Sequence, residues 1–509
     1  MHGPRRSLPM MALLGVLLAL ADARISADAA GGAAPAGQRP AAATAANARL
    51  AGALEVGTQR ERDDVAALVD YRPSYPFWQH VFTIPDGSIA YGSARDGRLL
   101  ATFPTRSDWT AEGRWITATH RDVLLDQQLS SDLDERREQL GALLEPAVGP
   151  VLHNPTRGLS VAPNALRYGR FLSEWGAIYE RFGVPRHLGL AQALVESGFN
   201  GTVRSEANAL GLCQWLQPNW RQLQRLAGSP IEAANQTTQA AYCAAHLTIL
   251  ATKYGSFIPA LSEHHAGGTN IGRTLINGER LGAITVREQY FAGSDFARDL
   301  RTLTPGTFSD VYGTYGPRSY RYAEMIFGNV SNVAQFEAGT PQQRIFAMRV
   351  TKSTSLSTIA RLSKLTPEEI RRFNPALRSK VPAGASVYLP KHVPALGRNV
   401  TFWHTPATAA YATVLESFVS LNVSVDEWNS PSFDAVLQDF RRRFAATRTE
   451  EGGVMATMLG YVLAGREGSG ERAILAEFRT DDRLLQLFDE ARAQREELRD
   501  RSGSQSLTN

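Results

Sequence analysis

Apolar side chains recur every three or four positions from about Asn164 onward, and this period predicts α-helices. The first helix has four large apolar residues on one face: Phe171, Trp175, Ile178 and Phe182. Gly183 ends it, and Pro185 stands in the first turn of the next helix, where its missing N–H has no partner to lose. The second helix is apolar along one side: Leu188, Leu190, Ala191, Leu194 and Val195. We therefore expect an apolar helix that ends at Glu196.

Short strands joined by Asp-Gly turns are predicted ahead of these helices. Three runs rich in strand-forming residues lie at 80–84, 88–91 and 98–103, and Asp-Gly pairs separate them at 86–87 and 96–97. An Asp-Gly pair between two such runs is a strong hairpin signal. We expect a small meander, followed by a charged helical stretch from about Arg121 to Leu144.

The N-terminal pattern is typical of a secretory signal peptide. Arg5 and Arg6 precede the apolar run from Met10 to Ala21, which has 12 residues, fewer than the roughly 20 that span a bilayer. Small-x-small cleavage sites follow, and no cysteine near them offers a site for lipidation. We expect an exported protein, periplasmic or otherwise outside the cytoplasm, without a transmembrane anchor.

Composition and charge exclude few function classes. The chain has 509 residues, 43% hydrophobic and 20% charged, which is ordinary for about three globular domains. Lys and Arg number 54 against 50 Asp and Glu, for a net charge of +4. This excess is small and reads as dispersed, so no nucleic-acid partner is expected.

Cys213 and Cys243 are the two cysteines of the chain. An even pair in an exported protein favours a disulfide, which would close a loop of about 30 residues. Two buried free thiols are the alternative. A catalytic thiol would need a histidine partner, and the position of His246 one turn after Cys243 does not by itself supply one.

Glu196 is the candidate acid of the chain. The helix dipole disfavours an anion at the C-terminal end of a helix, and burial against apolar neighbours raises the pKa of a carboxyl group in the same direction. A carboxylic acid that stays protonated near neutral pH can protonate the leaving oxygen in glycosidic cleavage. The alternative is a solvated glutamate at a helix end.

The residues around Glu196 resemble the soluble lytic transglycosylase family. The first motif is Glu196-Ser197-x-Phe199-Asn200. The second motif and a proline follow it at the family's spacing: Ser205, Asn208, Gly211-Leu212-Cys213-Gln214 and Pro218. The preceding Phe-Gly-Val-Pro-Arg-His-Leu resembles the membrane-bound lytic murein transglycosylase D subgroup. The resemblance covers roughly residues 164 to 330.

The resemblance implies a lysozyme-like helical domain that cleaves the β-1,4 bond between N-acetylmuramic acid and N-acetylglucosamine in peptidoglycan, without a cofactor. Glu196 would be the single acid and base, and the muramyl C6 hydroxyl would attack to give a 1,6-anhydro product. By the same resemblance, Ser197 and Gln214 would orient the substrate's acetamido group or the catalytic region. A helix-end serine and a polar rim glutamine are the alternatives.

The sequence departs from the family in its third motif. Glu263-His264-His265-Ala266-Gly267 stands where the family has Ala-Tyr-Asn-Ala-Gly, so His264 and His265 would line the substrate pocket. Protonation of His265 could make activity depend on pH. The histidine pair has no third ligand at a recognisable spacing, so no metal is expected. The family's final tyrosine corresponds to Tyr320 in Arg318-Ser319-Tyr320, after a longer interval than usual.

A second segment resembles a lysin motif (LysM), a strand-helix-helix-strand unit that binds N-acetylglucosamine chains. The resemblance rests on several short runs: Arg349-Val350, Leu356, Ile359-Ala360, Thr366-Pro367-Glu368-Glu369-Ile370, Phe373-Asn374-Pro375, Gly384 and Tyr388-Leu389-Pro390. Thr366 and Glu369 form a predicted capping box. The family's Gly-Asp-Thr-Leu is Ser353-Thr354-Ser355-Leu356 here, so a structural spacer is the alternative to glycan binding.

These patterns predict an α+β multidomain protein whose helical C-terminal region has Phe418, Trp428, Phe433, Phe440 and Phe444 as its core. The expected parts are a signal peptide (1–29), a flexible leader (30–54), an α+β region of unknown role (55–150), the transglycosylase domain (160–335), the lysin-motif-like domain (345–392) and a helical accessory region (400–500).

Three functions remain open from the sequence. The favoured one is an exported lytic transglycosylase whose partner is the peptidoglycan glycan strand. A noncatalytic peptidoglycan-binding or scaffolding protein is the second, because the third motif and the lysin motif are altered. The third is a hydrolase like goose-type lysozyme, which cleaves the same bond by transferring the sugar to water. The presence of Glu196-Ser197 and of 211–214 favours catalysis.

Overall fold

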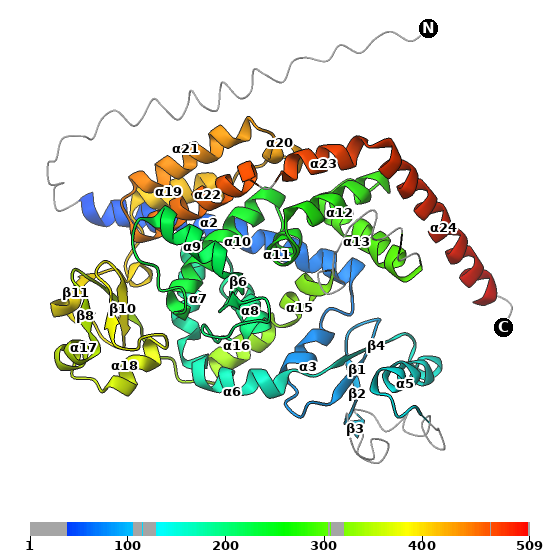
Figure 1. Cartoon of the computed structure of the whole chain (residues 1–509), viewed down its shortest axis with the longest axis horizontal. Helices are drawn as coiled ribbons and strands as arrows, with labels where there is room; N and C mark the ends of the chain where they lie inside the picture. The colour runs from blue at the N-terminus through cyan, green and yellow to red at the C-terminus, as the bar shows by residue number, and fades with distance from the viewer. Residues whose placement is uncertain are drawn as a thin grey trace, which may run out of the picture. The chain divides into compact units, whose positions relative to one another are not determined.

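The computed structural model describes residues 38–104, 114–115, 129–303, 306, 320–468 and 470–506. The expected signal peptide, the start of the leader, and Arg318 and Ser319 lie outside these residues. The chain divides into Met1–Ala45 and Ala46–Asn509, and the contacts below belong to the second unit. Figure 1 shows its helices and three groups of strands. In the described part of the chain, no helix is both long enough and apolar enough to cross a membrane.

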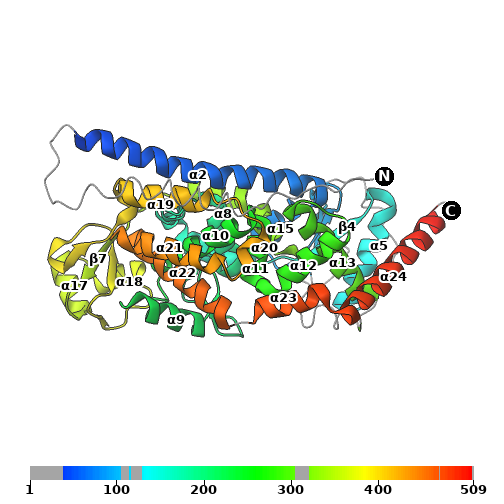
Figure 2. The same cartoon turned by 90° about the horizontal axis from the view of Figure 1, so that it is seen from above.

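The long helix α2 (Gln38–Tyr71) replaces most of the expected flexible leader. The leader expectation was wrong from Gln38 onward, because this alanine-rich stretch has high helix propensity and buries Ala46, Ala53 and Leu68. The buried carboxylate of Asp64 accepts hydrogen bonds from Ser256 Oγ and from the Phe257 amide, both at 2.6 Å. Arg60 also reaches the Val419 carbonyl, at the end of α19, which lies beside α2 in Figure 2.

An antiparallel sheet follows in the order β3-β2-β1-β4. Its strands are β1 (Ile89–Ser93), β2 (Leu99–Phe103), β3 (Arg114–Trp115) and β4 (Val151–Pro155), with α5 (Leu133–Val148) packed against it. The hairpin of β1 and β2 confirms two of the predicted strands. The strand predicted at 80–84 was wrong, because that stretch belongs to the helix α3 (Phe77–Thr83). Its buried residues have helical spacing: Phe77, Trp78, Val81 and Phe82.

A helical domain built around α10 comes next. Its elements are α6 (Gly158–Tyr168), η2 (Gly169–Phe171), α7 (Leu172–Arg181), α8 (Arg186–Ser197), α9 (Gln217–Ala227), α10 (Gln236–Tyr254), α11 (Phe257–Ala266), α12 (Gly268–Arg280), α13 (Val286–Leu303), α15 (Tyr322–Gly328) and α16 (Val330–Ala338). Almost every residue of α10 is buried, because other helices cover it on all sides. The helices predicted over 171–182 and up to Glu196 are confirmed as α7 and α8.

The segment from 346 to 399 is a small α+β unit, yellow in Figure 1. It contains β7 (Phe346–Val350), β8 (Thr354–Ser355), α17 (Leu356–Ser363), α18 (Pro367–Phe373), β9 (Lys380–Val381), β10 (Ser386–Leu389), η4 (Pro394–Leu396) and β11 (Gly397–Asn399). Its main sheet has the order β10-β7-β11. The capping box of Thr366 and Glu369 is confirmed. The identification of this unit as a lysin motif stays a prediction.

The C-terminal helices pack onto the helical domain. They are η5 (Phe402–His404), α19 (Ala409–Val419), α20 (Val425–Asn429), α21 (Phe433–Ala446), α22 (Glu450–Gly468), α23 (Glu471–Thr480) and α24 (Asp482–Ser506). The five aromatic residues predicted as their core are buried, and they share one apolar cluster with α7, α8 and α10. A buried ion pair between Arg181 of α7 and Glu451 of α22 joins the two regions.

Candidate functional site

Glu196 lies in the last turn of α8. Gly198 ends the helix in the left-handed conformation, with φ at 57°, where glycine has no steric cost. The preceding apolar turns are fully buried, and the Glu196 side chain itself is 12% exposed. Burial raises the pKa of Glu196 to about 7. The protonated and ionised forms of the carboxyl group are therefore both populated near neutral pH, and the side chain is still reachable from solvent.

Tyr322 is the tyrosine that contacts Glu196. Its hydroxyl donates a short hydrogen bond to Oε1 of Glu196 and lies 3.5 Å from Nε2 of Gln192, one turn earlier on α8. The sequence expectation was Tyr320, but that residue lies in a separate apolar cluster with Phe296 and Phe488. Only Tyr322 begins α15, the helix that packs against α8, so the structure assigns the contact to the residue two positions later.

The second motif forms a small hairpin beside Glu196. Strands β5 (Ala209–Leu210) and β6 (Trp215–Leu216) are joined by a turn. At Gly211 φ is +79°, and an added Cβ would lie 2.0 Å from Nε2 of Gln239, so only glycine fits. Asn208 has a φ of 60°, as expected for asparagine in the left-handed region.

The side chains of Ser197 and Gln214 donate hydrogen bonds to backbone carbonyl groups. The Ser197 hydroxyl donates to the Ala193 carbonyl at 3.0 Å, and the Gln214 amide donates to the Gly211 carbonyl at 2.9 Å. These bonds hold the end of α8 and the hairpin turn. In the structure both side chains therefore shape the elements next to Glu196, while the oxygens of both remain able to accept a hydrogen bond.

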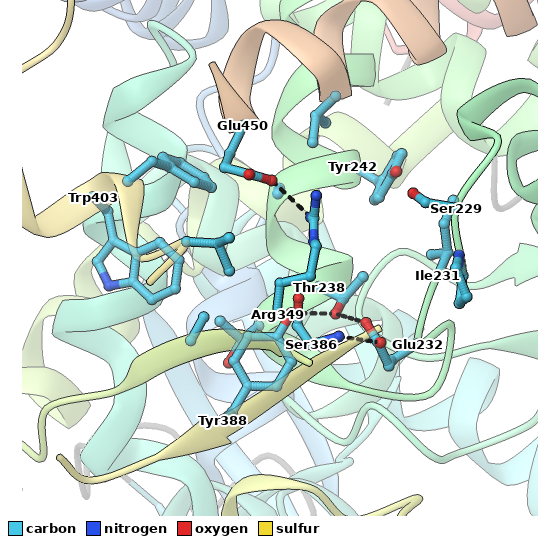
Figure 3. Close-up of a pocket in the computed structure, with 17 residues that line it drawn as sticks. Ser229, Ile231, Glu232, Thr238, Tyr242, Arg349, Ser386, Tyr388, Trp403 and Glu450 are labelled. Carbon is cyan, nitrogen blue, oxygen red and sulfur yellow. Dashed lines mark hydrogen bonds and ion pairs between the residues drawn. The ribbon is translucent and has the colours of Figure 1, made fainter. Parts of the chain in front are cut away.

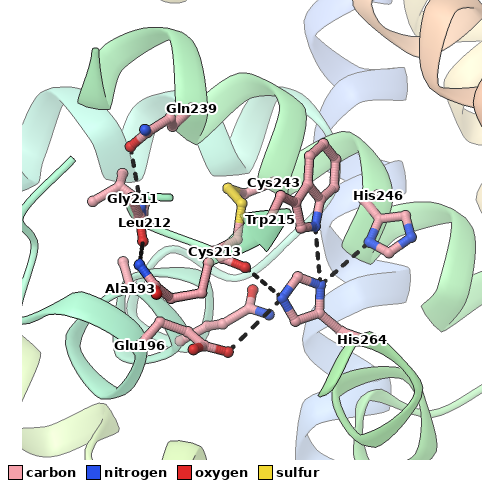
Figure 4. Close-up of a disulfide and its surroundings, with 12 residues drawn as sticks. Ala193, Glu196, Gly211, Leu212, Cys213, Trp215, Gln239, Cys243, His246 and His264 are labelled. Carbon is pink, nitrogen blue, oxygen red and sulfur yellow. Dashed lines mark hydrogen bonds and ion pairs between the residues drawn. A yellow bond between two sulfur atoms is a disulfide. The ribbon is translucent and has the colours of Figure 1, made fainter. Parts of the chain in front are cut away.

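His264 faces Glu196 from α11, as Figure 4 shows. Its Nε2 lies 2.8 Å from the Cys213 carbonyl oxygen, which can only accept, so Nε2 carries the hydrogen. The same nitrogen lies 3.8 Å from Oε1 of Glu196. Burial lowers the pKa of His264 to about 3, and the neighbouring His246 acts in the same direction. His264 is therefore neutral near pH 7 and does not hold Glu196 in its charged form.

Aromatic rings surround His264. Trp215 donates from Nε1 to its Nδ1 at 3.4 Å, and the ring of His246 lies 5.6 Å away. Tyr461 of α22 stacks on Trp215 with 6.0 Å between ring centroids, so the C-terminal region supports this side of the site. His265 is exposed and lies against Tyr322, the other residue that contacts Glu196. The centroids of the two rings are 4.6 Å apart.

Cys213 and Cys243 form a disulfide with a Cα–Cα distance of 6.1 Å. It ties the hairpin, whose Cys213 carbonyl holds His264, to the central helix α10 (Figure 4). The described residues include no free cysteine and no group of three or more His, Cys, Asp or Glu placed to hold a metal ion.

Part of the chain is similar to a known domain family. Residues 173–283 match the model of the transglycosylase SLT domain, and this range contains α8, the hairpin and α11. The mainly helical structure with small sheets is consistent with a lysozyme-like SLT domain. The match shows that this part of the chain is similar to transglycosylase SLT domains. No curated protein matches the chain.

Three residues of the site were missed by the sequence reasoning: Tyr322, Trp215 and Tyr461. Tyr322 lies outside the matched range. The helical spacing of Tyr322 and Ile326 could have revealed it, because this spacing marks the buried face of α15. Trp215 directly follows the second motif. Tyr461 had no signal, because its helix returns to the site from more than 200 residues later in the chain.

Replacing Tyr322 by Phe is expected to shift the alkaline limb of the activity profile. The hydroxyl stabilises the carboxylate, so its loss raises the pKa of Glu196 above the present value of about 7. A hydrogen bond to a charged group is worth about 1.5–3 kcal/mol, which corresponds to a shift of about 1–2 pH units. The measurement is the rate of peptidoglycan cleavage between pH 5 and 9.

The matched control is Tyr320→Phe, which removes the same hydroxyl from a separate cluster two residues away. Its alkaline limb should coincide with that of the unmodified protein. An unshifted limb in Tyr322→Phe, or an equal shift in both variants, would contradict the assignment of Tyr322 as the residue that positions Glu196.

Proposed function

We propose that the protein is an exported peptidoglycan lytic transglycosylase in which Glu196 is the single catalytic acid and base and the product carries a 1,6-anhydro-N-acetylmuramic acid end. The observation that carries the proposal is the Glu196 carboxyl group, which is buried, has a pKa raised to about 7 and lies within a transglycosylase SLT domain. A group with this pKa can give up and regain a proton near neutral pH.

The first step needs Glu196 in its protonated form. Its carboxyl hydrogen passes to the oxygen between N-acetylmuramic acid and N-acetylglucosamine as that bond breaks. Tyr322 stabilises the carboxylate that remains, because its hydroxyl already donates to Oε1. The neutral His264, whose Nε2 lies 3.8 Å from the same oxygen, borders the carboxylate without adding a positive charge that would hold it in the ionised form.

The second step uses the carboxylate as a base. Glu196 removes the proton of the muramyl C6 hydroxyl, whose oxygen attacks the anomeric carbon and closes the 1,6-anhydro ring. A retaining glycosidase with a carboxylate nucleophile would instead have two carboxyl groups about 5 Å apart. In the described part of the chain, no second carboxylate acts on the pKa of Glu196, which burial raises and the Tyr322 hydroxyl lowers. This favours attack by the substrate's own groups.

Further roles follow from the same proposal. The acceptor oxygens of Ser197 and Gln214, together with the exposed ring of His265, would contact the sugar next to the cleaved bond. The resemblance to the membrane-bound lytic murein transglycosylase D subgroup, the signal peptide, the periplasmic location and the lysin-motif-like domain at 345–392 belong to this proposal as well.

Mass spectrometry of the products released from purified peptidoglycan sacculi tests the proposed function. Fragments with 1,6-anhydro ends are expected. Fragments with reducing ends would show a hydrolase and contradict the proposed second step. No release at any pH between 5 and 9 would show a binding protein without catalysis.

A further inference from the structure

The positive charge of the chain is concentrated in one segment. Residues 345–400 hold ten of the 54 Lys and Arg and two of the 50 Asp and Glu, so this segment has a net charge of +8 and the rest of the chain −4. Four of the five lysines of the chain lie there: Lys352, Lys364, Lys380 and Lys391. The expectation that the charge is dispersed was wrong, because an average over the whole chain hides this segment.

Most of this charge faces solvent, although Arg372 and Lys391 lie near enough to Glu369 to lower the pKa of its carboxyl group. Nine of the ten basic residues are exposed. Glu450 of α22 pairs with the tenth, Arg349, and with the exposed Arg398. For the other eight, no carboxylate lies within ion-pair distance among the described residues. A surface with several unpaired cations raises the local concentration of anions.

Four of these residues gather at one edge. Thr354 and Ser355 pair with Val381 and Lys380, and the Leu356 amide donates to the Ser379 carbonyl at 2.8 Å. This pairing brings the loop after β7 beside the loop before β10. The basic residues at this place are Lys352, Arg371, Arg378 and Lys380, and Nη2 of Arg371 lies 3.5 Å from the Arg378 carbonyl. We call these four residues the basic edge.

Buried contacts fix this unit to the helical domain (Figure 3). The carboxylate of Glu232 accepts a hydrogen bond from the Ser386 amide of β10 at 2.6 Å, and Nδ2 of Asn235 donates to the Phe373 carbonyl at 2.9 Å. A cavity of about 70 Å³ lies beside Glu232 and the Arg349–Glu450 pair, too small for a sugar. These contacts therefore fix the basic edge on the helical domain that carries Glu196, and no flexible linker separates the two.

We propose that the basic edge binds the carboxylates of peptidoglycan stem peptides by charge. The inference rests on the proposed function, because peptidoglycan is the polymer that the same chain would cut, and its stem peptides carry free carboxylates. Arginine presents paired N–H donors that fit a carboxylate, and lysine adds a mobile point charge. Single exposed ion pairs are weak, so the four residues act together along one polymer.

Co-sedimentation with purified sacculi tests the inference. The full chain carries Glu196→Gln so that the polymer is not consumed. The triple variant Lys352→Gln, Arg378→Gln, Lys380→Gln is expected to bind at least about tenfold more weakly at low salt. A control loses the same charge at three exposed residues outside the segment: Arg221→Gln, Arg225→Gln and Arg483→Gln. The control should bind like the parent, and an equal loss in both variants would overturn the inference.

Two further conditions separate ionic binding from sugar binding. Raising the salt concentration shortens the range of charge interactions, to about 10 Å at 0.1 M, so binding should fall steeply as salt increases. Sacculi whose carboxylates have been amidated should lose the same binding, and neutral N-acetylglucosamine oligomers should not compete. Binding that resists salt and amidation but yields to the oligomers would overturn the inference, as would stronger retention on anionic lipid vesicles than on sacculi.

Failure of the inference and failure of the proposed function are distinguishable. Cleavage is measured on the chain with Glu196 intact, whereas binding is measured on the Glu196→Gln chain. Cleavage together with unchanged binding of the triple variant would overturn the basic edge alone. Charge-dependent binding without any cleavage would support the basic edge and overturn the proposed function.

Discussion

Replacing Glu196 by Gln is expected to lower the release of fragments from peptidoglycan by about 10³-fold, within the range of 10²–10⁴ that a positioned general acid or base contributes. Gln keeps the shape of the side chain and can still accept the hydrogen bond of Tyr322. It has no proton to give to the leaving oxygen and cannot act as the base of the second step. The measurement is the initial rate of soluble fragment release from purified sacculi at pH 6.

The matched control is Glu477→Gln, the same change at an exposed position of α23. It should retain the rate of the unmodified protein. A rate for Glu196→Gln within tenfold of the unmodified protein would show that another group is the acid. Binding to sacculi serves as a check on folding, because a folded Glu196→Gln chain should still sediment with them.

The same substitution is expected to stabilise the protein at alkaline pH. The pKa of Glu196 is raised from 4.5 to about 7 by burial, so the folded state prefers the protonated form. Below pH 4.5 the group is protonated in both states and costs nothing. As the pH rises from 4.5 to 7, the unfolded state loses its proton first, and the folded state is destabilised by about 3 kcal/mol above pH 7.

Gln does not ionise, so Glu196→Gln removes this cost. Its stability relative to the unmodified protein should rise from about zero at pH 4 to about 3 kcal/mol at pH 8, measured by urea unfolding at both values. Glu477→Gln should show no comparable rise. A constant difference across this pH range would mean that the carboxyl group of Glu196 is not desolvated in the folded protein.

A variant that loses activity and gains stability indicates a functional residue whose presence destabilises the folded state. The apolar turns of α8 that raise the pKa of Glu196 are the same turns that pack the domain core. The folded protein therefore carries a cost at neutral pH for a carboxyl group that can exchange its proton.

Local patterns predicted the framework of the site. The apolar period ends α7 and α8 within one residue of the observed ends at Arg181 and Ser197, because one buried face sets both the length and the rotation of a helix. The capping box of Thr366 and Glu369 was also predicted. Each of these features depends on residues within a few positions of one another.

The errors have a physical reason as well. The stretch around His80 contains residues that favour strands, yet its buried positions repeat with the helical period once Phe77 and Trp78 are included. Tyr320 and Tyr322 are two positions apart, and only the packing of α15 on α8 decides which of them reaches Glu196.

By itself, the sequence determined that Glu196 ends an apolar helix and that a glycine turn and a disulfide-capable pair follow it, because these features are written in short-range spacing. Only the tertiary structure decided what surrounds the carboxyl group: Tyr322 from α15, the neutral His264 from α11, and Trp215 supported by Tyr461 of α22. The pKa of Glu196 depends on the desolvation that these distant segments produce together. A local sequence pattern cannot predict this pKa, because the segments come from different parts of the chain.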